Sequence, residues 1–259
     1  ILGAAAKAKT RILNILVLGI MAGSFIAMGA QSSSLAVHNI SNVGLARTLA
    51  GCVFPVGLMM IVFVGGELFT GDCMMSMAWM QRKIHFADML RTLVLVYVSN
   101  FVGAAMIAFL VAHSGQYDYS SGALGAYTIK VAYGKVHLSF ANALISGILC
   151  NILVCVAVLM AAAAKDIAGK VLAIFFPILA FVVSGFEHCV ANMYYIPAGI
   201  FASKNAAYAA KALELYNIDS TQLSSLNWGS FAISNLIPVT IGNIIGGAMH
   251  DYFSGMISL

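Results

Sequence analysis

Residues 171 to 201 read VLAIFFPILAFVVSGFEHCVANMYYIPAGIF, an apolar run interrupted by the polar group Ser184-Gly-Phe-Glu-His188. Such a run is long enough to cross a bilayer, which takes about 20 apolar residues in a helix. Lipid offers no hydrogen-bond partner, so a helix can break inside a membrane only where protein or a water-filled cavity covers the freed backbone groups. The stretch therefore predicts a membrane-spanning helix that is broken beside a functional site.

The composition of the whole chain agrees with this prediction. Of its 259 residues, 61% are hydrophobic and 8% are charged, whereas soluble domains carry about 25% charged residues. So few charges cannot cover a water-facing surface, which excludes a soluble protein and makes the lipid bilayer a predicted partner. The formal net charge of +4 is modest and indicates no nucleic-acid partner.

Apolar runs of this length occur six times, which predicts one all-α transmembrane channel domain over residues 1–259. An even number of spans places both termini on the same side of the membrane. The expected spans, of which the second and fifth are broken, are Ile12–Ala30, Leu45–Leu68 continuing to Met80, Met89–Ala112, Ser139–Ala164, Lys170–Gly185 continuing to Phe201, and Gly229–Phe253.

Lysine and arginine predict the orientation, because short cytoplasmic segments carry an excess of them. On the side of the N-terminus lie Lys7, Lys9, Arg11, Arg82, Lys83, Arg91, Lys165 and Lys170, and on the other side lie Arg47, Lys130, Lys135, Lys204 and Lys211. This bias predicts a multi-pass protein of the plasma (inner) membrane with both termini cytoplasmic. The stretch through Lys9 is interpreted as a trimmed cytoplasmic end, without a cleaved signal peptide.

The two halves of the chain, about 1–112 and 130–259, repeat each other. Asn100-Phe-Val-Gly-Ala-Ala-Met106 matches Asn243-Ile-Ile-Gly-Gly-Ala-Met249, Gly66-Glu-Leu68 matches Gly185-Phe-Glu-His188, and Gly19-Ile-Met21 matches Gly147-Ile-Leu149. The matches come in the same order, with three spans in each half. Since three is odd, the halves insert upside down relative to each other, which is typical of permeases that bind solute at broken helices.

The break in the second span is Glu67-Leu-Phe-Thr-Gly-Asp72. One interpretation is that Thr70 and Gly71 line a pore, because a broken membrane helix requires protein or water around it. The other is that the helix simply leaves the membrane at this point. Glu67, and Glu187 in the other break, are expected to support the broken helices, because an unpaired buried carboxylate is too costly.

His188 in the fifth span is the histidine predicted nearest the middle of the membrane. A lone buried histidine is often a hydrogen-bonded core residue, but ionisable groups within a membrane are functional candidates. Its place at the repeat-related break favours the functional interpretation, and its titration near neutral pH would let it pass a proton to an anion. Asn151 and Asn243 lie in the middle of their spans, where they either bond across helices or contact solute.

Several classes of site are not expected. The five cysteines form no CxxC pair, so we predict neither a metal nor a disulfide. The chain has no GxxxxGK[ST] loop for nucleotide, no paired histidines for a haem and no Ser/His/Asp grouping. These observations predict a protein without catalytic residues or cofactor, which is not an enzyme, and they disfavour a membrane-anchored redox subunit.

Four stretches resemble the formate/nitrite transporter family. They are Glu67-Leu-Phe-Thr-Gly71, Lys135-Val-His137, Ser184-Gly-Phe-Glu-His-Cys-Val-Ala-Asn-Met193 and Asn235-Leu-Ile-Pro-Val-Thr-Ile-Gly-Asn-Ile-Ile-Gly-Gly247. The resemblance covers the chain from about Lys7 onward. It implies a homopentamer of six-span protomers with an aquaporin-like fold, in which each protomer has its own pore for small monovalent anions: formate, nitrite or hydrosulfide.

The resemblance also implies roles for individual residues. His188 would be the central pore histidine, Thr70 would belong to the loop that shapes one side of the pore, and Lys135 would be a basic residue near its outer part. Two apolar constrictions would be formed by Phe54, Leu58, Leu68 and Phe181, with Asn151 and Asn243 as polar pore residues.

The substrate is expected to be hydrosulfide, because the first break and the short termini most resemble the hydrosulfide channel branch, with formate and nitrite still open. The alternative is an aquaporin-like pore for small neutral solutes. It explains the apolar constrictions but requires neither the central histidine nor Lys135.

Overall fold

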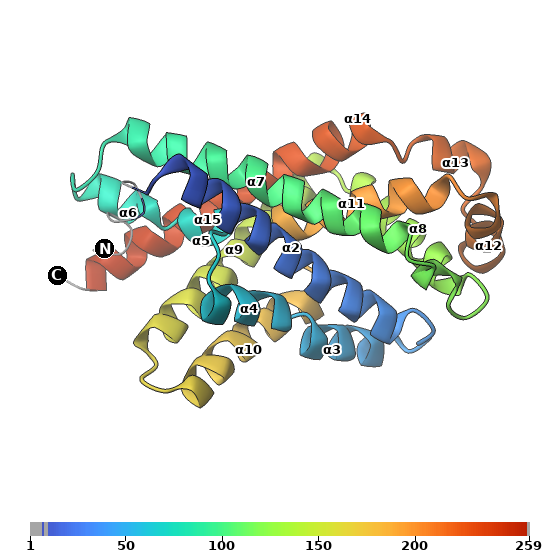
Figure 1. Cartoon of the computed structure of the whole chain (residues 1–259), viewed down its shortest axis with the longest axis horizontal. Helices are drawn as coiled ribbons and strands as arrows, with labels where there is room; N and C mark the ends of the chain where they lie inside the picture. Colours follow the sequence, from blue (N-terminus) through green and yellow to red (C-terminus); the bar gives the residue numbers. More distant parts are fainter. Residues whose placement is uncertain (1–6, 8–9, 258–259) are drawn as a thin grey trace.

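The computed structural model describes residue 7 and residues 10–257, with side chains up to residue 249. The predicted end through Lys9 thus lies, apart from Lys7, outside the described residues. All regular secondary structure in the described part is helical, and six helices of 18 to 27 residues are long and apolar enough to cross a membrane. The start of α2 and the end of α15 lie at the same end of the molecule (Figure 1), as six crossings require.

The helices follow the predicted spans. Three unbroken helices are α2 (Ile12–Val37), α7 (Phe86–Ala112) and α9 (Phe140–Ala163). The second span consists of α3 (Val43–Val53), α4 (Val56–Val64), α5 (Phe69–Asp72) and α6 (Met75–Met80), and the fifth of α10 (Ile167–Ser184) and α11 (Cys189–Ser203). The sixth runs through α14 (Trp228–Ser230), the π-helical η2 (Phe231–Leu236) and α15 (Ile237–Ile257). Outside the spans lie η1 (Gln116–Asp118), α8 (Ala123–Val136), α12 (Ala206–Tyr216) and α13 (Ser220–Ser224).

The prediction of six spans with the second and fifth broken is confirmed, with two differences in extent. The first helix continues to Val37, seven residues beyond the expected end, because Ser33 and similar small polar residues stay buried against other helices. The connection between the third and fourth spans contains α8, whose Ala and Ile side chains are buried in the core. Hydropathy alone misses α8 because it is shorter than a span.

Glycines allow two pairs of spans to pack with their backbones in contact. A Cβ at Gly103 of α7 would overlap the carbonyl oxygen of Ile20 in α2, and one at Gly242 of α15 would overlap that of Leu144 in α9. Small residues at such positions are the usual means of close helix packing in membranes. The pairs α2–α7 and α9–α15 occupy equivalent places in the two halves.

A buried asparagine holds the break in the second span. Asn100 of α7 donates from Nδ2 to the carbonyl oxygens of Gly19 and Glu67, each at 2.8 Å. Its Oδ1 accepts from the backbone N–H of Phe69, the first residue of α5, at 2.9 Å. The amide of one side chain thus satisfies backbone groups on both sides of the break, which would be costly if left unpaired away from water.

Asn243 of α15 makes the same three bonds in the second half. Its Nδ2 donates to the carbonyl oxygens of Gly147 and Glu187, at 2.8 and 3.0 Å. Its Oδ1 accepts from the N–H of Cys189, the first residue of α11, at 2.9 Å. The partners correspond residue by residue to those of the first half, and this confirms an inverted repeat of three plus three spans.

Replacing either asparagine should destabilise the protein severely. Asn243→Ala or Asn100→Ala leaves buried backbone donors and acceptors unpaired, at about 1–3 kcal/mol each, so we expect each to lower the free energy of unfolding by about 3 kcal/mol. Thermal unfolding of the detergent-solubilised protein, followed by circular dichroism, would measure this. Asn14→Ala, at an exposed position on α2, is the matched control. An equal effect of all three substitutions would contradict the clamp.

Candidate functional site

The two helix breaks meet at one buried hydrogen bond. Thr70 of α5 and His188, the N-cap residue of α11, lie with Oγ1 and Nε2 2.9 Å apart. Their side chains come from opposite halves of the repeat, and the two residues are 0% and 3% exposed. The structure therefore brings together the two polar residues that the sequence placed at separate breaks.

The capping role of His188 defines its protonation state. Nδ1 of His188 accepts the backbone N–H of Ala191 at 3.1 Å, so this nitrogen carries no proton. A neutral imidazole has one N–H, which must then be on Nε2. His188 consequently donates from Nε2 to Thr70 Oγ1. Thr70 is fully buried and lines neither of the two cavities that flank this pair, so its contact with solute stays a prediction.

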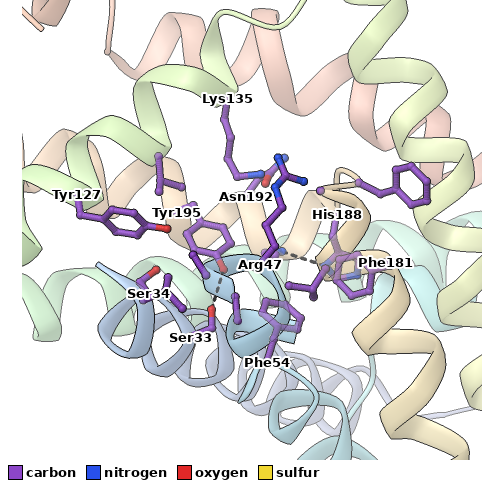
Figure 2. A pocket seen from close by; sticks show the side chains of 18 residues that line it. Ser33, Ser34, Arg47, Phe54, Tyr127, Lys135, Phe181, His188, Asn192 and Tyr195 are labelled. Carbon is purple, nitrogen blue, oxygen red and sulfur yellow. Dashed lines mark hydrogen bonds between the residues drawn. The ribbon is translucent and has the colours of Figure 1, made fainter. Parts of the chain in front are cut away.

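A cavity of about 250 Å³ lies on one side of this pair. We call it the Lys135 cavity (Figure 2). Lys135, His188 and Arg47 line it together with aromatic and hydroxyl side chains. Phe54 and Phe181 also border it, with ring centroids 5.4 Å apart in an edge-to-face contact.

A second cavity of about 610 Å³, which we call the Lys7 cavity, lies on the other side of the pair, toward the N-terminal residue Lys7. Leu58 and Leu68 line it, with Lys7, Glu67 and Asp72. Lys7 Nζ is 2.6 Å from Glu67 Oε2 and 2.5 Å from Asp72 Oδ1. Burial alone would lower the pKa of Lys7, but attraction to the two carboxylates outweighs it and raises the pKa above its ordinary value. This lysine therefore stays charged.

The two cavities share no lining residue among those described, and apolar side chains separate them. Phe54 borders the Lys135 cavity and Leu58, four residues later, borders the Lys7 cavity. Phe54, Leu58, Leu68 and Phe181 are each at most 4% exposed. The four side chains expected from the resemblance thus lie at the junction of the two cavities, which is closed.

Glu187 ties its helix break to three other elements. Its Oε1 accepts from Lys135 Nζ at 2.7 Å, and its Oε2 accepts from Asn192 and Asn235, at 2.7 and 3.2 Å. The backbone N–H of Glu187 donates to Ser146 Oγ at 3.1 Å. Asn235 belongs to the π-helical turn η2, and such turns are frequent at functional sites.

Asn151 and Asn243 lie beside the breaks and border neither cavity. Asn151 donates from Nδ2 to the carbonyl oxygens of Thr70 and Asn243, at 3.2 and 2.6 Å. Its Oδ1 is buried without a hydrogen-bond partner among the described residues. Contact of these two side chains with solute stays a prediction, and the bonds across helices are what the structure contains.

Several residues of the site were not singled out from sequence. They are Arg47, Lys7, Asp72, Asn192 and Asn235. Arg47 and Asp72 could have been found, since ionisable groups within apolar segments are functional candidates. For Lys7 and Asn235 the sequence carries no signal, because their partners lie 43 or more residues away along the chain. Asn192 bonds to Glu187 only five residues earlier, but the sequence does not show that this bond forms.

The sequence and the fold match those of known membrane proteins. The family described as "Formate/nitrite transporter" matches residues 2–256. A probable formate transporter of Methanothermobacter thermautotrophicus is 38% identical, over 94% of this chain and 88% of its own length. The formate channel FocA of Haemophilus influenzae is 37% identical, over 89% and 81%. A solved structure titled "Pentameric formate channel with formate bound" superposes with a TM-score of 0.83 at 32% identity, covering 95% and 96%.

The inverted repeat, the paired helix breaks and the two cavities define a multi-pass membrane protein of the channel and transporter class, which is not an enzyme. The chain belongs to the formate/nitrite transporter family.

Replacing Lys135 alone should lower the stability of the protein far more than replacing Lys135 and Glu187 together. Lys135→Met leaves a buried carboxylate without its cation and should cost about 3–5 kcal/mol of stability, whereas Lys135→Met with Glu187→Gln should recover most of it. Thermal unfolding of the three variants checks this. Lys211→Met is the control, because its partner Glu214 is 62% exposed and such pairs contribute about 0–1 kcal/mol. Additive losses in the double variant would contradict the coupling.

Proposed function

We propose that this protein is a channel for small monovalent anions, with formate as the first candidate substrate. The observation that supports it best is the His188–Thr70 pair, which lies beside a short apolar junction between two cavities that each contain a lysine. The named relatives are formate channels or transporters, which favours formate. Hydrosulfide, expected from sequence, and nitrite are the competing substrates.

The His188–Thr70 pair lies where an anion crossing the membrane would lose its hydration. An ion that enters the apolar junction loses its hydration, which is costly unless other groups replace the lost hydrogen bonds. Thr70 has a hydroxyl proton free to donate, and the Nε2–H of His188 is beside it. The Thr70 hydroxyl, which accepts the bond from His188 Nε2–H, can donate its own proton to an anion at the junction and offers nothing comparable to a cation.

Proton transfer from His188 is the second part of the proposal. If the anion takes the Nε2 proton, it becomes a neutral acid that crosses the apolar side chains more easily. The ring would then be left as an unfavourable imidazolate unless a proton from the acidic solution outside reaches Nδ1, so that one proton is taken up for each one that leaves with the anion. That proton requires the bond from Ala191 N–H to Nδ1 to break, because two N–H groups cannot face each other. Transfer is thus coupled to a local opening at the start of α11.

A solved relative supports the assembly that we propose, and the distribution of lysine and arginine supports the orientation. The solved formate channel is described as pentameric, which favours a homopentamer with one pore in each protomer. In the plasma (inner) membrane that we propose, the lysine and arginine bias favours cytoplasmic termini, so that the Lys7 cavity opens to the cytoplasm and the Lys135 cavity to the outside.

A pore for neutral solutes such as glycerol is the second candidate. The apolar junction favours it, and so does the pairing of Glu67, Asp72 and Glu187 with lysines, because each carboxylate described in or beside the two cavities then has a cation partner. The donors at the junction are better suited to an anion, which accepts hydrogen bonds and offers none.

Flux into proteoliposomes tests the proposal. We expect rapid uptake of formate, rising as the pH outside falls, and slower uptake of glycerol. His188→Asn keeps a hydrogen-bond donor but cannot relay a proton. It should therefore remove most of the pH dependence and lower the rate of formate uptake at low pH by about tenfold or more, as expected for loss of a proton-transfer group. His113→Asn, at an exposed histidine, is the control.

Three outcomes separate the ideas. Uptake of glycerol without formate, hydrosulfide or nitrite would favour the neutral pore. Anion uptake with an unchanged pH profile in His188→Asn would leave the channel standing and refute the proton transfer. Uptake of hydrosulfide well above formate would restore the substrate expected from sequence.

A further inference from the structure

The positive charge of Lys135 is already neutralised inside its cavity. Its Nζ is 2.7 Å from Glu187, and the two side chains are only 16% and 6% exposed. A close pair of opposite charges produces little field a few ångströms away. Attraction of an anion into the Lys135 cavity therefore needs another cation.

Arg47 of α3 is that cation. It lines the same cavity as His188, and its side chain extends over the second helix break (Figure 2). Its Nη1 donates to the carbonyl oxygen of Val183 at 3.1 Å, at the end of α10. No carboxylate lies within ion-pair distance of Arg47 among the side chains that the structure describes.

Gly185 makes room for this arrangement. A Cβ at residue 185 would overlap the guanidinium group of Arg47, and the backbone there has a φ of +71°, which also favours glycine. The glycine that ends α10 at the break therefore also lets the arginine lie across the entrance of the cavity.

We propose that Arg47 captures the anion in the Lys135 cavity and selects for a carboxylate. This inference rests on the proposed function as an anion channel. Guanidinium presents five N–H donors in a planar fork that matches the two oxygens of a carboxylate, whereas a lysine offers a point charge. The bond to Val183 uses one donor, so an edge of the fork remains for formate. A round anion such as hydrosulfide gains the charge but not the paired hydrogen bonds.

A purely structural role of Arg47 makes different predictions. A cation beside the last carbonyls of a helix stabilises it slightly through the helix dipole. Loss of that contribution would lower the melting temperature slightly and leave the ratio of substrates unchanged. The test must therefore measure selectivity and salt dependence as well as stability.

The experiment is uptake of formate and hydrosulfide by proteoliposomes that contain the full chain, at low substrate concentration and two ionic strengths. Arg47→Gln should lower formate uptake by about tenfold at 0.01 M salt, the lower end of electrostatic steering effects. The deficit should shrink at about 0.15 M salt, where the Debye length is about 8 Å. Arg47→Lys should keep most of the hydrosulfide uptake and lose several-fold in the ratio of formate to hydrosulfide.

Lys130→Gln is the matched control, because it removes a positive charge from an exposed position on α8 that does not line the cavity. It should change neither rate nor ratio. If Arg47→Gln does not assemble, the ratio of formate to hydrosulfide uptake in Arg47→Lys still tests whether Arg47 selects for a carboxylate. Wild-type anion uptake with unchanged rate, ratio and salt dependence in both Arg47 variants would overturn the capture role alone. Absence of anion uptake by the wild-type protein would instead refute the proposed function, and this inference with it.

Discussion

Backbone groups left free in the middle of a membrane are the constraint on which this structure depends. Both breaks lie within the spans, where lipid cannot form hydrogen bonds with the free backbone groups. At each break a single asparagine, Asn100 or Asn243, bonds one donor and two acceptors of the main chain. A side-chain amide can do this because it combines an acceptor with two donors. The close packing of α2 on α7 and of α9 on α15 brings each asparagine within reach.

The functional site follows from this arrangement. Because the breaks are held open by asparagines from α7 and α15, the first residues of α5 and the N-cap of α11 are free to face each other, and Thr70 meets His188. Capping through Nδ1 fixes the proton of the histidine on Nε2, where it bonds Thr70. Helix termination, which looks like a purely structural matter, thereby sets the chemistry presented to a solute.

Most charges of the site are also used to stabilise the helix breaks. Asp72 and Glu187 are buried and Glu67 is partly buried, and such carboxylates would be costly alone. Lys7 pairs with both Glu67 and Asp72, and Lys135 pairs with Glu187. The pairs stabilise the breaks but cancel much of the field that a lysine would otherwise exert on a solute. Arg47 differs because its guanidinium contacts only a carbonyl oxygen among the described residues, which leaves its charge to act on the cavity.

Hydropathy and repeated motifs are local properties of the chain, so the amino-acid sequence alone predicts the six spans, the two breaks and the inverted repeat, and it singles out a histidine at the second break. It could not show that Asn243 acts as a clamp, that Lys135 is paired with Glu187, or that Arg47 borders the same cavity as His188. Those facts depend on the packing of helices from opposite halves, and only the tertiary structure decides which polar side chains use up their hydrogen bonds on the protein and which keep them for a solute.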